Sequence, residues 1–600
     1  MTPAPSRHSP ERAPRRTSAG SPASPAAGFG VRDAIAMAGI LGFALLMMLH
    51  TGSRRGAEFM PWPDGLEYAA MTVNLAHGLG PVLHFGGYSY PSRYPAGYPL
   101  MIAALVPHAI GISRAYAVTI AIGLMAIAAL FTLARRMFDL QCATVAALVL
   151  ATSPIFIAYS TLVLSDVPAT LLAIAAAGLL FAIGAEEDRE PRRPRVAILL
   201  WAAFGLAAGY AVAIRPTNAA MLAGLALGFT MVRPPRESIA KLIKPLGASA
   251  AAFALPVAWL VRNNAVYLGG AFRSGYAWWV SEVYGAGGAG FSTAYLFGPT
   301  MPRNPHGNVI VYASALLGVD GMLGDRGDAR YFLYPVAAAA FAIIGIAAIM
   351  RAPARRSARR VVWFGIGFLA ALTAIYSVHV FTDVVFLMPA CFVMFLGAGY
   401  GATIANHWML ARFGMRRNNA GHVAGVFGVI VLDAILAFAI GAEAVARLSA
   451  PPQGSAMVAA LAQVDAQLPP GATVASNISL QFLQLYIPGA ERRFIGLNSR
   501  DPGERFTDYH LSRLFVKRSQ GWTGPIPPTI FVSDSISPDA EKLLAASART
   551  SAGAYLILCA PESREYATVL KDEIARLSAD FDLTPIAENR SLAVFRLAPH

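Results

Sequence analysis

A succession of apolar blocks, each roughly 16–24 residues long, runs through the first three quarters of the sequence. A helix needs about 20 consecutive apolar residues to cross the hydrocarbon core of a bilayer, so each block predicts a membrane-spanning helix. The composition agrees, because 56% of the residues are hydrophobic and only 14% are charged, whereas soluble domains carry about 25% charged residues. The sequence therefore predicts a polytopic α-helical membrane protein.

The basic residues lie mostly in short connectors between these blocks, such as ARRMFD, DREPRRPR, RPPRESIAKLIK and RAPARRSARR. Connectors rich in Lys and Arg mark the cytoplasmic side of a membrane protein. Placing all of them on that side predicts about 11 spans. The expected spans are residues 31–50, 115–134, 143–159, 168–183, 196–213, 219–232, 246–261, 331–350, 361–380, 384–400 and 421–442.

The apolar segment 100–112 does not fit this alternation. It is short and contains Pro107 and His108. A segment of this length is more often interfacial or re-entrant than spanning. We therefore expect it to lie along the outer membrane surface or to dip partway into the membrane.

The chain divides into three regions by composition. Residues 1–30 are rich in Ser, Pro, Ala and Arg and predict a disordered, basic cytoplasmic tail. Residues 31–445 form the expected transmembrane domain, with outer loops at 51–114 and 262–330 and outer juxtamembrane helices. Residues 451–600 carry ordinary charge and alternate β-rich runs with helical stretches, which predicts an α/β domain. The threading places that domain outside the cytoplasm.

Several classes of function are disfavoured. The net charge of +14 is spread over the connectors, so there is no basic domain to follow a nucleic-acid backbone. Cys142, Cys391 and Cys559 lie far apart, which supports neither a zinc site nor a disulfide framework. The C-terminal region contains neither GxGxxG nor a P-loop, so no nucleotide site is indicated.

Carboxylates mark the expected outer face. Asp64 and Glu67 lie in PWPDGLEYAAMTVNLAHGLG, on the first outer loop, and their spacing places them on one face of a helix. Asp166 falls at the outer end of a later span, where an ionisable residue is a functional candidate because its burial is costly. Asp64 and Asp166 could each instead cap a helix, and this alternative stays open.

Cations accompany these acids. Arg93 lies among tyrosines in YSYPSRYPAGYPLM, against the charge bias of the outer side. A guanidinium can hold a phosphate through two parallel hydrogen bonds, and Arg215 and Arg262 are further cations expected outside. Several cations around outward carboxylates indicate a site for an anionic, lipid-borne substrate. The tyrosines alone would be explained by an interfacial belt.

Five segments in order, WPDGLEYAAMTVNLAHG, SRYPAGYPL, SPIFIAYSTLVLSDVPATLLA, GLAAGYAVAIRPT and WLVRNNAVYLGG, resemble the landmarks of the GT-C membrane glycosyltransferases. The pattern is most similar to the branch of bacterial aminoarabinose transferases and protein O-mannosyltransferases, and the likeness extends over about the first 270 residues. The resemblance implies that Asp64 is a general base, with Tyr68 four residues on. It also implies that Asp166 is the family's second acid and that Arg93 contacts donor phosphate.

One segment departs from the family pattern. Many relatives carry an Arg before a later Pro, whereas this chain reads FTDVVFLMPA, with Val384 and Val385 where a cation would stand. Asp383 and Pro389 are kept. A phosphate contact from this segment is therefore not expected.

The resulting hypothesis is an inverting glycosyl transfer on the outer face of a bacterial inner membrane, from a polyprenyl-phosphate sugar to a lipid, glycan or protein acceptor. Asp64 would take the acceptor proton, although Glu67 could be the base instead. Arg93, helped by Arg215 or Arg262, would stabilise the departing phosphate.

The other candidate residues have supporting roles in this hypothesis. Asp166 and Glu67 would orient the substrates or hold a divalent cation, Mg²⁺ or Mn²⁺, although no cofactor is certain. Loop 262–330 could fold over the site and exclude water. The expected substrate-binding aromatic residues are Tyr68, Tyr94 and Tyr98.

Two other classes of protein share some of these features. A transporter or lipid flippase could have the same number of spans, but such proteins often show inverted repeats, and the sequence shows none. The acids also fall on outer loops rather than in the middle of a span. A non-catalytic scaffold that presents its outer α/β domain is a third reading, in which Asp64 and Asp166 would be replaceable.

Overall fold

The computed structural model describes most of the helical region and parts of the C-terminal region. In the first it describes residues 29–412 except 56–62, 86–87, 107–111, 190, 192, 233–238, 302–304, 320–332 and 353–354. In the second it describes residues 461, 463–476, 483, 487, 492–496, 509–525, 538–559, 575, 577–588 and 592–600. Nearly all of the expected tail, the expected span 421–442, Pro107 and His108 lie outside the described residues.

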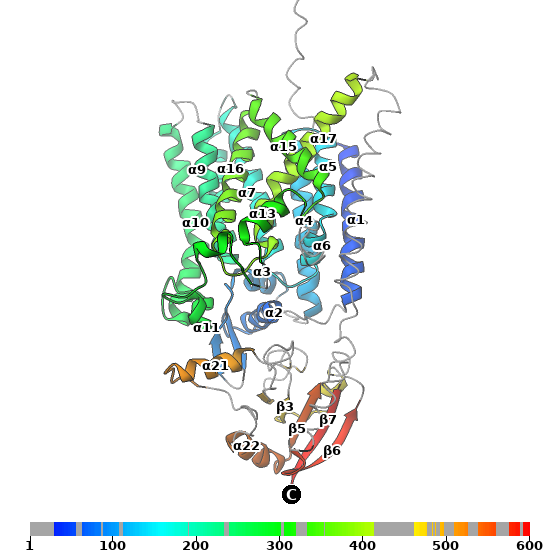
Figure 1. Ribbon diagram of the computed structural model, residues 1–600, viewed down its shortest axis with the longest axis vertical. Helices are drawn as coiled ribbons and strands as arrows, with labels where there is room; N and C mark the ends of the chain where they lie inside the picture. The colour runs from blue at the N-terminus through cyan, green and yellow to red at the C-terminus, as the bar shows by residue number, and fades with distance from the viewer. Residues whose placement is uncertain are drawn as a thin grey trace, which may run out of the picture.

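Long apolar helices run side by side through the first region (Figure 1). Within the described residues, six are long and apolar enough to cross a membrane: α1 (Val31–Arg55), α4 (Ile112–Met137), α7 (Asp166–Glu187), α8 (Pro194–Ile214), α10 (Ile239–Leu268) and α16 (Arg356–Ser377). Two bent pairs raise the number to eight. They are α5 (Leu140–Ala151) with α6 (Pro154–Ser160), and η5 (Val384–Ala390) with α17 (Phe392–Arg412). The chain is an integral membrane protein.

The bends occur next to prolines. The axis turns by 65° between α5 and α6, where Pro154 begins the second helix, and by 66° between η5 and α17, just after Pro389. Proline lacks the amide hydrogen that an uninterrupted helix requires, so a bend forms at such positions.

The described residues contain fewer candidate spans than the sequence predicts for the whole chain. Each expected span up to residue 400 falls on one of these helices, on the 11-residue α9 (Met221–Met231) or on the 16-residue α15 (Val336–Arg351). Both of these helices are shorter than an ordinary membrane crossing. The described residues therefore give six to eight candidate spans, and the number of about 11 stays a prediction.

The expected outer loops form several short elements. The first contributes α2 (Pro63–Ala76), the hairpin of β1 (Val82–Phe85) and β2 (Tyr88–Pro91), and α3 (Gly97–Leu105). The second contributes α11 (Gly275–Trp279), α12 (Ser281–Tyr284), η3 (Thr293–Leu296) and α13 (Asn308–Leu316). Figure 1 places α2, α3 and α11 toward the C-terminal sheet.

Helix α3 holds the part of segment 100–112 that the structure describes best. It has nine residues, too few to cross a membrane, and Tyr98, Pro99 and Ile102 are buried. Gly97 packs against the end of α8 so closely that an added Cβ would lie 2.5 Å from the Ala213 carbonyl oxygen. The described part of the segment thus packs against α8, and its position relative to the membrane stays a prediction.

The C-terminal region contains a mixed five-stranded sheet in the order β4-β3-β5-β7-β6. The strands are β3 (Thr473–Ser476), β4 (Arg493–Gly496), β5 (Ala554–Cys559), β6 (Phe581–Glu588) and β7 (Leu592–Pro599). Strands β4, β3 and β5 are parallel, and β7 runs antiparallel to β5 and β6. The helices α21 (Tyr509–Ser519) and α22 (Pro538–Ala548) accompany it. Strands and helices thus occur together here, as the sequence predicts.

The packing of α3 on α8 gives a test of stability. Gly97→Val should lower the free energy of unfolding by about 1–3 kcal/mol, because the new side chain meets backbone that cannot move aside. Gly178→Ala, inside α7, is the matched control, since an added Cβ there meets nothing within 4 Å. Thermal midpoints in detergent measure both, and equal midpoints would contradict this packing.

Candidate functional site

Asp64 lies in the first turn of α2 with an exposed carboxylate. Helix α2 begins at Pro63, so Asp64 is inside the helix rather than at the capping position before it. Its side chain is 44% exposed, and one carboxylate oxygen lies 3.8 Å from Nη2 of Arg93. A negative charge in the first turn of a helix is stabilised by the helix dipole. The residue is thus both held in place and open to a substrate.

Glu67, one helical turn further, is wholly buried. Its carboxylate accepts hydrogen bonds from the Ser92 hydroxyl and the Arg93 backbone amide, both at 3.0 Å, and it forms an ion pair with Nε of Arg93. The side chain of Arg93 is only 10% exposed. Glu67 therefore fixes both the backbone and the guanidinium of Arg93, and Nη2 of the same guanidinium lies near Asp64.

The three predicted substrate-binding tyrosines form one aromatic cluster. The Tyr68 ring lies 4.9 Å from Tyr94 and 5.6 Å from Tyr98, and Tyr94 meets Tyr276 of α11 edge-on at 5.4 Å. Burial raises the pKa of Tyr68, Tyr94 and Tyr98 above the ordinary value, so all three hydroxyls stay protonated. Tyr98 is fully buried and its hydroxyl contacts that of Thr119, so its contacts are those of a packing residue.

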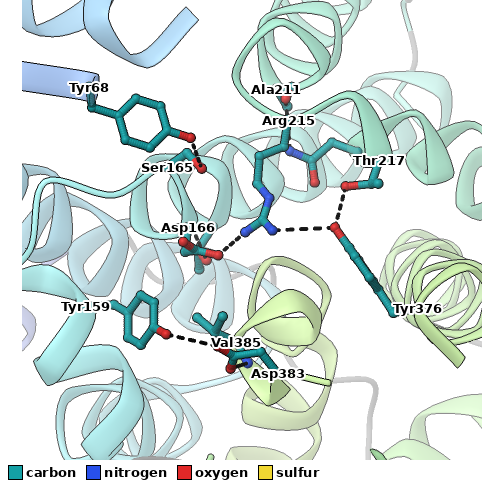
Figure 2. A network of polar contacts seen from close by, with 12 residues as sticks. Tyr68, Tyr159, Ser165, Asp166, Ala211, Arg215, Thr217, Tyr376, Asp383 and Val385 are labelled. Atoms are coloured by element: carbon teal, nitrogen blue, oxygen red, sulfur yellow. Dashed lines mark hydrogen bonds and ion pairs between the residues drawn. The ribbon is translucent and has the colours of Figure 1, made fainter. Parts of the chain in front are cut away.

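A second ion pair lies beside this cluster (Figure 2). Asp166, at the start of α7, pairs with Arg215, which directly follows α8. The Arg215 guanidinium also lies 3.4 Å from the Tyr376 hydroxyl, which is 2.8 Å from that of Thr217. Because the side chain of Asp166 is only 8% exposed, its direct effect is to orient Arg215.

One hydrogen bond links the helix that carries Glu67 to the residue before Asp166. The Tyr68 hydroxyl donates to Ser165 Oγ at 3.0 Å, and Ser165 immediately precedes Asp166. Tyr68 belongs to the same helix, α2, as Asp64 and Glu67. The site is therefore built on α2, the 92–93 turn, the start of α7 and the end of α8.

Asp383 lies in the same region as Asp166 and Arg215 (Figure 2). It accepts a hydrogen bond from the Val385 amide at 3.0 Å, which caps η5, and another from the Tyr159 hydroxyl at 3.2 Å. Removal of this partly buried carboxyl from water raises its pKa to about 6. The Arg215 guanidinium lies over the ring of Phe386, 5.3 Å from its centroid. A cation from elsewhere in the chain thus contacts the segment FTDVVFLMPA, which lacks the arginine of the family pattern.

The charges act on one another across this region. Burial raises the pKa of the Tyr276 hydroxyl, and the negative charge of Asp64 raises it further. The positive charges of Arg93 and Arg215 oppose that increase. Tyr276, from the outer loop, thus lies within electrostatic range of both ion pairs.

Arg262 is not brought to this cluster. It is exposed on α10, and within the described part of the chain no contact joins it to Asp64, Arg93 or Arg215. Sequence reasoning missed Ser165, Thr217, Tyr159, Tyr276 and Tyr376, which are common polar residues in apolar surroundings. Asp383 was noted only within a departing motif, although an acid just before a span is a signal that could have singled it out.

Metal binding by this chain stays untested. Among the residues that the structure describes, no three His, Cys, Asp or Glu side chains gather in a way that could hold a metal ion. The divalent cation expected from the sequence therefore has no assigned ligand set here.

Comparisons with known proteins give a match to one sequence family and to one fold. A family model described as dolichyl-phosphate-mannose-protein mannosyltransferase matches residues 99–261, a range that includes Asp166 and Arg215. The structure of ArnT from Cupriavidus metallidurans in the apo state aligns with a TM-score of 0.57 at 13% identity, covering 94% of this chain and 98% of that chain. The form bound to undecaprenyl phosphate gives a TM-score of 0.55 at 13% identity, covering 93% and 98%. No curated protein sequence matches significantly.

The fold and the site define a membrane protein with charged residues gathered at one end of its helices, against a C-terminal sheet. The family match over residues 99–261 and the fold shared with ArnT both agree with the GT-C superfamily of membrane glycosyltransferases. The resemblance seen in the sequence is thus confirmed.

The raised pKa of Asp383 makes stability depend on pH. Its pKa rises from the usual 3.8 to about 6 in the folded protein, so the folded state keeps a proton that the unfolded chain releases. This group therefore makes the folded state less stable as pH rises from about 4 to about 6. Asn stays neutral and retains an oxygen for the Val385 amide. We expect Asp383→Asn to match the wild type near pH 4 and to be more stable above pH 6, by on the order of 2–3 kcal/mol. Thermal midpoints of both proteins across this range provide the measurement, and parallel curves would contradict the assignment.

Proposed function

We propose that this protein transfers a glycosyl group from a polyprenyl-phosphate sugar to a hydroxyl of a lipid, glycan or protein. The observation that carries the proposal is the exposed Asp64 carboxylate beside Arg93, whose guanidinium the buried Glu67 holds in place. The fold supports it, because ArnT shares this architecture and one of its structures contains undecaprenyl phosphate. Neither the fold nor the family match favours a transporter or flippase.

The reaction is a single displacement at the anomeric carbon. The acceptor oxygen attacks this carbon while Asp64 takes the acceptor proton, the role of a general base within hydrogen-bonding reach. The bond between the anomeric carbon and the phosphate oxygen breaks, and its electron pair leaves with the polyprenyl phosphate. Because attack and departure occur on opposite faces of the sugar, the anomeric configuration inverts.

Asp64 is a better base than Glu67 on geometric grounds. The Glu67 carboxylate is wholly buried and already accepts bonds from Ser92 and Arg93. A general base must approach the proton that it removes, and of these two acids Asp64 has the exposed carboxylate. Glu67 then acts as a positioning residue for Arg93.

The cations stabilise the departing phosphate, on which charge increases in the transition state. Arg93 is the first candidate because it faces Asp64. Arg215 is the second, held by Asp166 and Tyr376 so that little conformational freedom is lost when it binds an anion. The exposed Arg262 is not part of this proposal. A divalent cation, Mg²⁺ or Mn²⁺, stays an untested expectation.

The proposed location is the outer face of a bacterial inner membrane, with the N-terminus in the cytoplasm. Basic connectors, among them those that precede α8 and α16, support this orientation. The site and the C-terminal sheet lie at the same end of the helices (Figure 1), so both would face outward. A polyprenyl donor in the outer leaflet could then reach Arg93 from the membrane.

Replacing the base tests the proposal directly. Asp64→Asn should lower the rate of sugar transfer in membranes supplied with a polyprenyl-phosphate sugar by about 100-fold or more, because Asn cannot take the acceptor proton. Asp188→Asn is a matched control, since that side chain is 46% exposed and lies beyond the far end of α7. Full activity of Asp64→Asn at normal protein levels would remove the assignment.

A further inference from the structure

A short piece of the second outer loop covers the Arg93 turn. This cover segment, residues 274–285, contains α11 and α12. An added Cβ on Gly275 would lie 2.7 Å from Cα of Arg93, so only glycine permits this approach. Trp279 Nε1 donates to the Pro91 carbonyl oxygen at 2.7 Å, and Tyr276 packs on Tyr94. The cover segment is thus seated on the backbone that presents Arg93.

The C-terminal region also contacts the cover segment. Arg513 of α21 pairs with Glu282 of α12, and Lys517 Nζ lies 4.1 Å from the centroid of the Trp278 ring. Trp522 meets Trp278 edge-on at 6.0 Å. Figure 1 shows α21 beside α11, between the helices and the C-terminal sheet.

The first loop is tied to the same C-terminal stretch. The Tyr90 hydroxyl of β2 donates to the Pro525 carbonyl oxygen at 2.8 Å. Burial lowers the pKa of Lys517, as does the positive charge of Arg273, whereas the negative charge of Glu282 opposes this change. A cation partly withdrawn from water interacts more strongly with an aromatic face. Residues 509–525 thus contact both the first loop and the cover segment.

We propose that residues 509–525 act as a clasp that holds the cover segment over Arg93, so that the C-terminal region excludes water from the donor during transfer. This inference rests on the proposed function. Water that reaches the site would attack the anomeric carbon in place of the acceptor, giving free sugar and polyprenyl phosphate. Loosening the clasp should therefore increase hydrolysis of the donor relative to transfer.

Charge reversal tests the clasp. Arg513→Glu should raise the ratio of donor hydrolysis to transfer about two- to fivefold, the effect expected from losing one exposed ion pair. Adding Glu282→Arg to the same protein should return the ratio toward the wild-type value. Arg356→Glu is the matched control, because the Arg356–Asp188 pair has similar exposure (24% and 46%, against 26% and 40%) and includes the start of α16, away from the cover segment. It should leave the ratio unchanged.

Hydrogen exchange provides a readout independent of activity. Amides of residues 275–284 should exchange faster in Arg513→Glu than in the wild type, and the reversed pair should restore their protection. Unchanged exchange and an unchanged ratio in an active Arg513→Glu protein would overturn the clasp and leave the proposed function intact. A wild-type protein that neither transfers nor hydrolyses the donor would overturn the proposed function and the clasp together.

Discussion

A wholly buried carboxylate beside a buried guanidinium determines how the end of the helices that faces the C-terminal sheet is built. Either charge alone would be costly in such surroundings, and removing one partner of a buried pair typically costs about 3–5 kcal/mol. Glu67 satisfies Arg93 through the guanidinium and through its backbone amide, and it also binds Ser92. The pair thereby fixes the turn between β2 and α3, and α3 in turn packs on the end of α8. Arg93 and Arg215 are held in one region by this chain of contacts.

The two halves of the site depend on each other through α2. The same helix supplies Asp64, Glu67 and Tyr68, and Tyr68 reaches Ser165 at the start of α7. Asp166 then orients Arg215, and Arg215 reaches Tyr376 at the end of α16. Residues from α2, α7 and α16, and Arg215 just after α8, are thus tied into one polar network, which Figure 2 shows in part. Replacing any one of these side chains is expected to alter the positions of the others.

Patterns of local sequence predicted much of the fold. Apolar block length and basic connectors located helices at each expected span up to residue 400, because both depend only on the thickness and charge asymmetry of a membrane. The non-spanning placement of the short block 100–112 stays a prediction. Breaks near Pro154 and Pro389 were not anticipated as bends within spans, and the short α9 and α15 show why a count based on hydropathy alone leaves the number of spans open.

The structure brings most of the predicted site residues together, and their roles stay proposals. Asp64, Glu67, Arg93, Asp166 and Arg215 were all singled out, and the structure gathers them at the same end of the helices. Spacing placed Asp64 and Glu67 on one face of a helix, but the partners that bury Glu67 come from another segment. The Asp166–Arg215 pair, the Tyr376 contact and the placement of Asp383 likewise depend on helix packing, which periodicity does not specify. Arg262 looked equivalent to Arg215 in sequence, yet it lies exposed on α10.

We propose that Arg93, held by Glu67, receives the phosphate of a polyprenyl donor in front of Asp64. An experimental structure of the protein with bound polyprenyl phosphate tests it most directly. We expect the phosphate within hydrogen-bonding distance of Arg93, on the side that faces Asp64. A phosphate bound elsewhere, for example at Arg262 with Arg93 still paired to both acids and out of reach, would contradict the account.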